Sequence, residues 1–136
     1  MTTIYPYLFF TGNCREAMNF YKDCLGGNLT LQPVEDSPMA GQWPAEMQKG
    51  ILHSMLEKGP LVLLASDMGD PTLKGIENTT IQLSLNCTTK EELQTHFSQL
   101  SRGGQVIREP HEFFAGTMAA LTDKYGKSWM FYCEGK

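Results

Sequence analysis

Apolar side chains recur at helical spacing in two separate stretches of this 136-residue chain. In the first stretch, residues 14–25, apolar positions fall three or four residues apart, as they do on one face of a helix. They are Cys14, Ala17, Met18, Tyr21, Cys24 and Leu25. Asn13 precedes this stripe and Glu16 follows three residues later, which is the spacing of a capping box. The pattern predicts an amphipathic helix that begins after Asn13.

A second helical stripe occurs in the other half of the chain. It consists of Leu93, Phe97 and Leu100. Two capping boxes can precede it, either Thr88 with Glu91 or Thr89 with Glu92, and the spacing alone does not choose between them. The pattern predicts a second helix that packs on one face only.

Both stripes end at a glycine pair. The pairs are Gly26–Gly27 and Gly103–Gly104, and glycine ends a helix without strain because it enters the left-handed conformation freely. The two pairs have the same separation along the chain as Pro33 and Pro110. The sequence therefore contains two copies of one structural unit.

Strand patterns surround each predicted helix in the same order. One strand comes before the helix and three come after it, the last two forming a hairpin whose turn contains glycine. The predicted strands lie in residues 4–10, 28–34, 51–67, 79–86, 105–109 and 116–133, the two longest segments being hairpins. This order predicts an α+β fold of two tandem βαβββ modules, residues 1–70 and 78–136, within one domain, 1–136.

Charge and cysteine content narrow the classes of function. The net charge is −4 and no run of Lys or Arg occurs, which argues against nucleic acid and anionic membranes as partners. The longest aliphatic run, Leu61–Ala65, is too short to cross a bilayer, and the apolar part of the N-terminus has no basic region before it. The four cysteines form no CxxC motif and are expected to be free thiols. We therefore expect a cytoplasmic protein.

Three phrases of the sequence carry a family resemblance. They are PYLFFTGNCREAMNFY at 6–21, LHSMLEKGPLVLLASD at 52–67 and TDKYGKSWMF at 122–131. In this order they resemble the PhnB-like branch of the glyoxalase/bleomycin resistance/dioxygenase superfamily, also called the vicinal oxygen chelate superfamily. The resemblance implies a curved, cup-shaped mixed sheet with helices on the outer face, a ligand in the inner cleft and, in many members, a homodimer.

The implied cup gives the strand at 79–86 two distinct faces. Its apolar residues should pack on the helices, and its polar residues should face the cleft. The apolar set is Ile81, Leu83 and Leu85, and the polar set is Thr80, Gln82 and Ser84. Phe113 and Phe114 stand where PhnB-like chains usually carry aromatic residues, and they either line the cleft or pack in the core.

The resemblance also points to a metal site, which this sequence does not support. Metal-using members place His and Glu ligands on four cleft-facing strands. The corresponding positions here fall near Tyr5–Tyr7 and at Leu63, Thr80 and Met130, and none of these side chains suits a hard divalent metal. We therefore predict neither a metal nor another cofactor, and we assign Met130 to the cleft.

His53 is the titratable residue of greatest interest, because it lies inside an apolar strand. It is either a proton shuttle or ligand donor in the cleft, or else a core or dimer-contact histidine. Asp67 and Asp123 stand at strand ends, where aspartates usually cap turns. The loop at 35–49 carries Met39, Trp43 and Met47 and is expected to be a lid or a dimer contact.

These features together predict a small-molecule binding protein without the family's metal ligands. Its site would consist of His53, Thr80, Gln82, Ser84, Phe113, Phe114 and Met130. No GxSxG or GxGxxG motif occurs, so the residues do not decide between a binding protein and an enzyme. The alternative is a metal-dependent lyase, isomerase or dioxygenase-like enzyme with a rearranged site, in which His53 is a ligand and Glu112 or Asp67 an acid or base.

Overall fold

The computed structural model describes residues 3–67 and 81–135. The chain divides into two compact units, residues 1–76 and 77–136, and each is considered by itself. Unit 1 contains β1 (Tyr7–Phe10), α1 (Cys14–Leu25), β2 (Asn28–Pro33), the short 3₁₀ helices η1 (Val34–Asp36), η2 (Ala40–Gln42) and η3 (Ala45–Met47), β3 (Ile51–Lys58) and β4 (Leu61–Asp67). Unit 2 contains β5 (Leu83–Cys87), α2 (Lys90–Leu100), β6 (Gln105–Phe113), β7 (Gly116–Thr122) and β8 (Ser128–Glu134).

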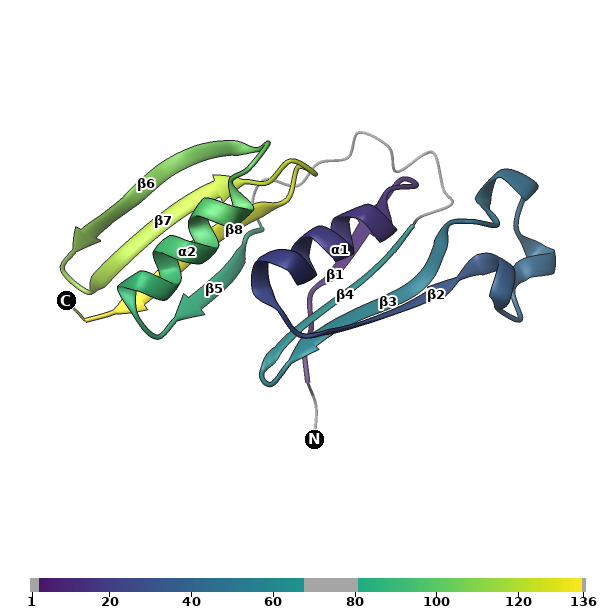
Figure 1. Ribbon diagram of the computed structural model, residues 1–136, viewed down its shortest axis with the longest axis horizontal. Helices are drawn as coiled ribbons and strands as arrows, with labels where there is room; N and C mark the ends of the chain where they lie inside the picture. Colours follow the sequence, from purple (N-terminus) through teal and green to yellow (C-terminus); the bar gives the residue numbers. More distant parts are fainter. Residues whose placement is uncertain (1–2, 68–80, 136) are drawn as a thin grey trace. The chain divides into compact units, whose positions relative to one another are not determined.

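The two units have the same topology (Figure 1). Each is a four-stranded mixed sheet, in the order β1-β4-β3-β2 in unit 1 and β5-β8-β7-β6 in unit 2. The first strand of each pairs parallel with the last, and the other neighbours are antiparallel. The predicted α+β fold of two repeated βαβββ modules is confirmed.

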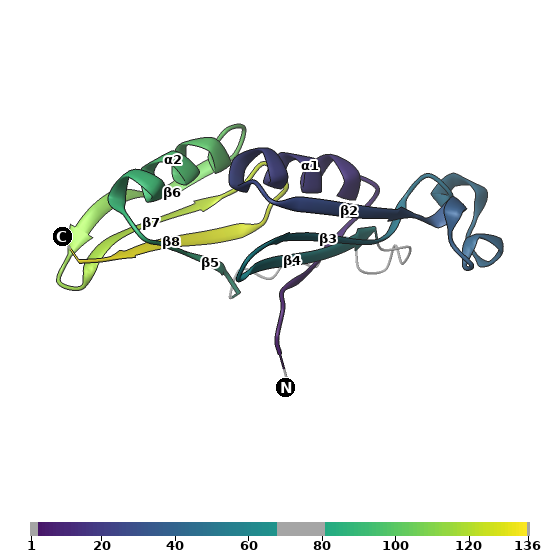
Figure 2. The same ribbon diagram turned by 60° about the horizontal axis from the view of Figure 1, so that its bottom comes forward.

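One helix covers one face of each sheet. In Figure 2 each sheet is seen nearly edge-on, with the helix of the same unit along one side of it. The predicted stripes supply the buried side of each helix, with Cys14, Met18 and Tyr21 of α1 and Leu93 and Leu100 of α2 fully buried. Each sheet therefore has a covered face, which forms the core. No helix among the described residues of the same unit covers the opposite face, which we call the open face.

The two helices begin in different ways. The predicted capping box at Asn13 is wrong, because its side chain makes no capping bond. The buried carboxylate of Asp67 accepts the Gly12 and Cys14 N–H groups instead, at 2.8 and 3.0 Å. At α2 the structure selects Thr89, whose hydroxyl accepts the Glu92 N–H at 3.1 Å.

Strand boundaries differ from the predicted ones at two places in unit 2. Strand β5 begins at Leu83, so Ile81 precedes it and is 66% exposed, and the prediction that Ile81 packs on the helix is wrong. The register explains this, because Leu83 is the first residue that pairs with β8. Strand β6 continues past the predicted residue 109 to Phe113, since it pairs with β7 as far as Gly116.

No helix among the described residues has the length and apolar character that a membrane crossing needs.

The second glycine of each pair is required because another strand passes very close to it. A Cβ at Gly27 would lie 2.7 Å from the Glu57 carbonyl oxygen, and one at Gly104 would lie 2.3 Å from that of Thr122. Each helix thus returns to its sheet at a point where only glycine fits.

We expect Gly104→Ala to lower the free energy of unfolding by about 1–3 kcal/mol, because the added methyl group meets backbone atoms that cannot rotate away. Urea unfolding followed by circular dichroism measures the change. The matched control is Gly41→Ala, where a Cβ meets no atom within 4 Å and the stability should hardly change. Equal losses in both variants would contradict this explanation.

Candidate functional site

The open face of unit 1 is defined by the alternation of side chains along β3. Ser54 faces α1, since its hydroxyl lies 3.6 Å from the Cys14 Sγ. Because neighbouring residues of a strand point to opposite sides, His53 and Met55 belong to the open face. Met55 pairs with Leu64 of β4, and Leu64 pairs with Tyr7 of β1, so these side chains share that face.

His53 lies beside a pair of aromatic side chains on this face. The Tyr7 hydroxyl lies 2.9 Å from His53 Nδ1, and the two rings are 5.8 Å apart. Phe9 stacks on Tyr7 with ring centroids 5.2 Å apart. Tyr7 and Phe9 remain 40% and 49% exposed, an unusual state for large aromatic side chains at the surface of a sheet. We call Tyr7, Phe9 and His53 the unit 1 cluster.

The residues of the unit 1 cluster come from two strands that are not neighbours in the sheet. Tyr7 is on β1 and His53 is on β3, with β4 between them. Ser66 of β4 pairs with Phe9 and is only 6% exposed. Tyr7 pairs with Leu64 of the same strand, so the Tyr7 hydroxyl reaches His53 across β4.

The open face of unit 2 carries another set of polar and aromatic side chains. Ser84 pairs with Met130, and Asn86 pairs with Tyr132. The Ser84 hydroxyl bonds the Asn86 side chain at 3.1 Å. Tyr132 donates to the Ala115 carbonyl at 3.0 Å, which fixes its ring on this face.

The predicted site residues fall into separate groups. His53 belongs to the open face of unit 1, whereas Ser84 and Met130 share the open face of unit 2. Gln82 immediately precedes β5 and is exposed. Thr80 lies outside the described residues.

The two phenylalanines of β6 and its turn differ in environment. Phe113 contacts the Tyr132 ring, with centroids 6.1 Å apart, and is half-buried. Phe114 follows the strand and is fully exposed, and its ring is nearly perpendicular to that of Phe113, with centroids 5.3 Å apart. Core packing therefore does not describe Phe114, and the assignment of both residues to a cleft stays a prediction.

Sequence reasoning missed part of the open faces. It did not assign Phe9 and Tyr132 to the site, and it considered Tyr7 only as a failed metal position. A usable signal was present, because Tyr5, Tyr7 and Phe9 occupy alternate positions in the first strand. The same alternation rule separates the two faces of the predicted strand at 79–86.

The metal positions implied by the fold can now be tested against the strand register. Leu63 was assigned to the open face, but it pairs with buried Leu56 on the covered face, so the assignment was one residue off. The open-face residue is Leu64, the partner of Tyr7, and its counterpart in unit 2 is Met130. These side chains do not fit a divalent metal. Residues 3–67 and 81–135 contain no group of three or more His, Cys, Asp or Glu that could hold one.

The strand-end aspartates organise the backbone. Besides the α1 amides, Asp67 accepts the Ile51 N–H at 2.8 Å through its second oxygen. Asp123 accepts the Tyr125 N–H at 2.8 Å and the Trp129 indole N–H at 2.8 Å. Both carboxylates are buried. The hydrogen bonds confirm the prediction of a turn cap for Asp123, whereas Asp67 joins two chain segments.

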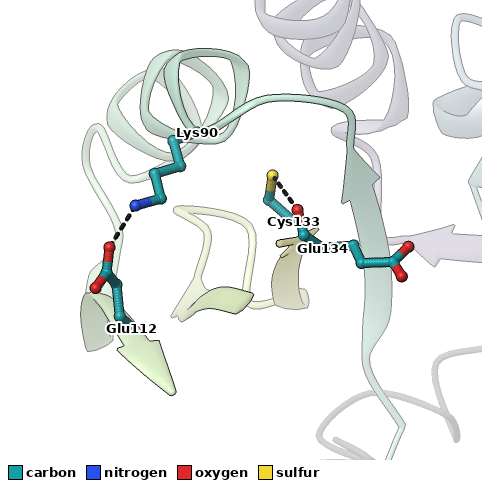
Figure 3. A network of polar contacts seen from close by, with 4 residues as sticks. All are labelled: Lys90, Glu112, Cys133 and Glu134. Atoms are coloured by element: carbon teal, nitrogen blue, oxygen red, sulfur yellow. Dashed lines mark hydrogen bonds and ion pairs between the residues drawn. The ribbon is translucent and has the colours of Figure 1, made fainter. Parts of the chain in front are cut away.

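Glu112 lies on the helix side of unit 2, away from the open face. Figure 3 shows the ammonium group of Lys90, the first residue of α2, pointing at the Glu112 carboxylate. This hydrogen bond holds the pKa of the Glu112 carboxyl below its ordinary value. In the same view Cys133 lies at the end of β8, with its thiol 3.6 Å from the Glu134 carbonyl oxygen. Glu112 belongs to unit 2, whereas His53 belongs to unit 1.

The four cysteine side chains are buried, and none of them forms a disulfide bond. Burial raises the pKa of Cys14 and that of Cys87 from 9.0 to about 11. A thiol must ionise to attack, so these two side chains stay protonated and unreactive near neutral pH.

The loop at 35–49 is held by its own contacts. The Gln48 amide donates to the carbonyl oxygens of Ala40 and Trp43, at 2.7 and 2.9 Å. Met39 remains exposed at the surface of the loop. Whether the loop is a lid or a dimer contact stays a prediction.

Comparison with known proteins identifies the family. A family model described as 3-demethylubiquinone-9 3-methyltransferase matches residues 2–132. The chain belongs to this family. It is 36% identical to protein PA1353 from Pseudomonas aeruginosa, whose crystal structure has a TM-score of 0.88 over 100% of both chains.

Two solved structures of lower sequence identity have the same fold. A PhnB protein from Bacillus cereus is 22% identical, with a TM-score of 0.75 over 97% of this chain and 99% of the other. A glyoxalase/bleomycin resistance protein/dioxygenase family enzyme from Burkholderia phytofirmans PsJN is 16% identical, with a TM-score of 0.66 over 96% and 97%. The predicted PhnB-like membership and the superfamily fold are confirmed.

We expect Asp67→Asn to lower the free energy of unfolding by about 2–4 kcal/mol, because the amide turns a donor toward buried backbone N–H groups. Urea unfolding measures the loss. The control is Asp23→Asn on the exposed side of α1, which should change stability by less than about 0.5 kcal/mol. A small loss at Asp67 would show that its carboxylate does not hold the two segments together.

We also expect the stability to fall as the pH rises from about 9 to about 11, the interval between the ordinary and the raised pKa of Cys14 and Cys87. The folded state holds these protons more tightly than the unfolded state, so unfolding releases them in this range. Urea midpoints at both ends of the interval measure the fall. The double variant Cys14→Ala with Cys87→Ala should show a smaller fall, and an equal one would contradict the assignment.

Proposed function

We propose that this protein binds a small organic molecule on the open face of a sheet and does so without the superfamily's metal site. The observation that carries the proposal is the unit 1 cluster. It combines exposed aromatic rings with a hydrogen-bonded imidazole, which is the mixture of apolar surface and few polar groups typical of ligand sites. The open face of unit 2 supports it, because Ser84 and Met130 offer a second surface of mixed polarity.

A catalytic role is compatible with the same residues. His53 is the side chain of the unit 1 cluster whose ring nitrogens can both donate and accept a proton. Leu64 and Met130 occupy metal positions of the fold, and their side chains do not suit a divalent metal. This argues against a mechanism that uses a metal chelated at these positions. Methyl transfer, which the family description names, is not part of the proposal, because the sequence contains no GxGxxG loop.

The proposal includes a cytoplasmic homodimer. Ile4 and Tyr5 are exposed ahead of β1, and apolar side chains of this size at a surface are common at contacts between copies. The four free cysteines favour a reducing compartment.

Two measurements on the purified protein test the proposal. Metal analysis of protein purified without chelator should find no near-stoichiometric Zn, Ni or Mn. A thermal-shift screen with a library of small aromatic and aliphatic compounds should find ligands that raise the melting temperature, because a ligand of the native state must stabilise it. A bound metal would favour the rearranged metalloenzyme instead, and a screen without any stabilising compound would contradict ligand binding.

His53→Ala tests the location of the site. We expect it to weaken the binding of the screened ligands by about tenfold, as the loss of a hydrogen bond and a packed ring would produce. Isothermal titration measures the affinity. His96→Ala, on α2 of unit 2, is the control and should bind as the unchanged protein does. Full affinity in His53→Ala would remove this residue from the site.

A further inference from the structure

The hydrogen bond between Tyr7 and His53 leaves one imidazole nitrogen available. Nδ1 faces the Tyr7 hydroxyl at 2.9 Å. Within residues 3–67 and 81–135, no side chain or backbone group bonds Nε2. A neutral imidazole carries one proton, so the partner of Nδ1 decides whether Nε2 donates or accepts.

We propose that Tyr7 donates its hydroxyl proton to Nδ1 and thereby makes His53 a fixed Nε2–H donor for the carbonyl oxygen of a flat aromatic ligand that rests on Tyr7 and Phe9. A phenol is a better donor than acceptor, which favours this direction of the hydrogen bond. Tyr7 is then a positioning residue, because it acts on the ligand's oxygen through His53. This inference rests on the proposed function and names its ligand class.

The ring stacking supports an aromatic ligand. Tyr7 and Phe9 already stack, with ring centroids 5.2 Å apart and an interplanar angle of 30°, so a third aromatic ring can continue this stack. About half of each side chain remains exposed. Such a surface favours another flat ring, because offset stacking adds to the burial of apolar area.

The orientation of the imidazole supports a carbonyl group near His53. The imidazole is tilted 40° from the Tyr7 ring, so it borders the aromatic surface and does not extend it. A ligand on the rings therefore meets a polar group at one edge only, which suits one carbonyl oxygen.

The tautomer can be measured without any ligand. ¹⁵N NMR of the imidazole nitrogens in alkaline buffer, where an ordinary histidine is neutral, should show a protonated Nε2 and an unprotonated Nδ1 for His53. Tyr7→Phe should shift both signals toward the mixture of tautomers found in a free imidazole. Tyr125→Phe, which removes a hydroxyl from the β7–β8 turn, is the control and should change neither. A protonated Nδ1 in the unchanged protein would overturn the proposal.

The ligand class is tested with two probes of the same shape. These are 2-acetylnaphthalene, which has a carbonyl oxygen, and 2-ethylnaphthalene, which does not. ¹H–¹⁵N NMR titration should show both at the unit 1 cluster, with the ketone bound about fivefold more tightly, as a net hydrogen bond of about 1 kcal/mol gives. Tyr7→Phe should abolish the preference and leave the affinity for 2-ethylnaphthalene unchanged.

The outcomes separate the two proposals. Equal affinity for both probes, or a preference that survives in Tyr7→Phe, overturns the role of Tyr7 while ligand binding stands. Absence of binding by both probes, together with an empty thermal-shift screen, overturns the proposed function. If Phe9→Ser lowers self-association in sedimentation and neither probe binds, the surface is a contact between two copies, and this proposal fails.

Discussion

A single amphipathic helix covers each four-stranded sheet, and this one-sided cover determines the rest of the structure. One helix can bury only one face of a sheet. The covered face holds the fully buried side chains, such as Leu56 below α1 and Phe131 below α2. The opposite face keeps polar and aromatic residues half-exposed, and the proposed binding surfaces exist because the described residues of each unit form no second helical layer over that face.

The two units share their topology but stabilise their helices differently. Asp67 pairs with Phe10 at the end of unit 1's parallel strands, and Cys133 pairs with Cys87 at the corresponding place in unit 2. The carboxylate of Asp67 binds the first amides of α1, whereas α2 relies on the Thr89 hydroxyl. A helix start needs acceptors for its free N–H groups, and the two copies obtain them from a distant strand end or from a local cap. The fold is compatible with both ways of capping the helix, so the residues at these positions can differ between the two units.

The unit 1 cluster illustrates how the sheet itself positions chemistry. The parallel pairing of β1 with β4 places Tyr7 one strand away from β3, and the Tyr7 hydroxyl reaches His53 across that strand. Neither residue is close to the other in sequence. The same pairing in unit 2 brings together Ser84 and Met130, so equivalent strand positions present different chemistry in the two copies.

Local rules determined much of this protein from sequence alone. The periodicity of apolar residues, the glycine pairs and the repeated strand order specified two βαβββ units, because helix and strand patterns depend on near neighbours. The Tyr7–His53 hydrogen bond, the reach of Asp67 to α1 and the exposure of Ile81 were decided by tertiary structure. Each depends on strand register and on side chains far apart in the chain, and a shift of one residue moves a side chain to the other face, as it did for Leu63.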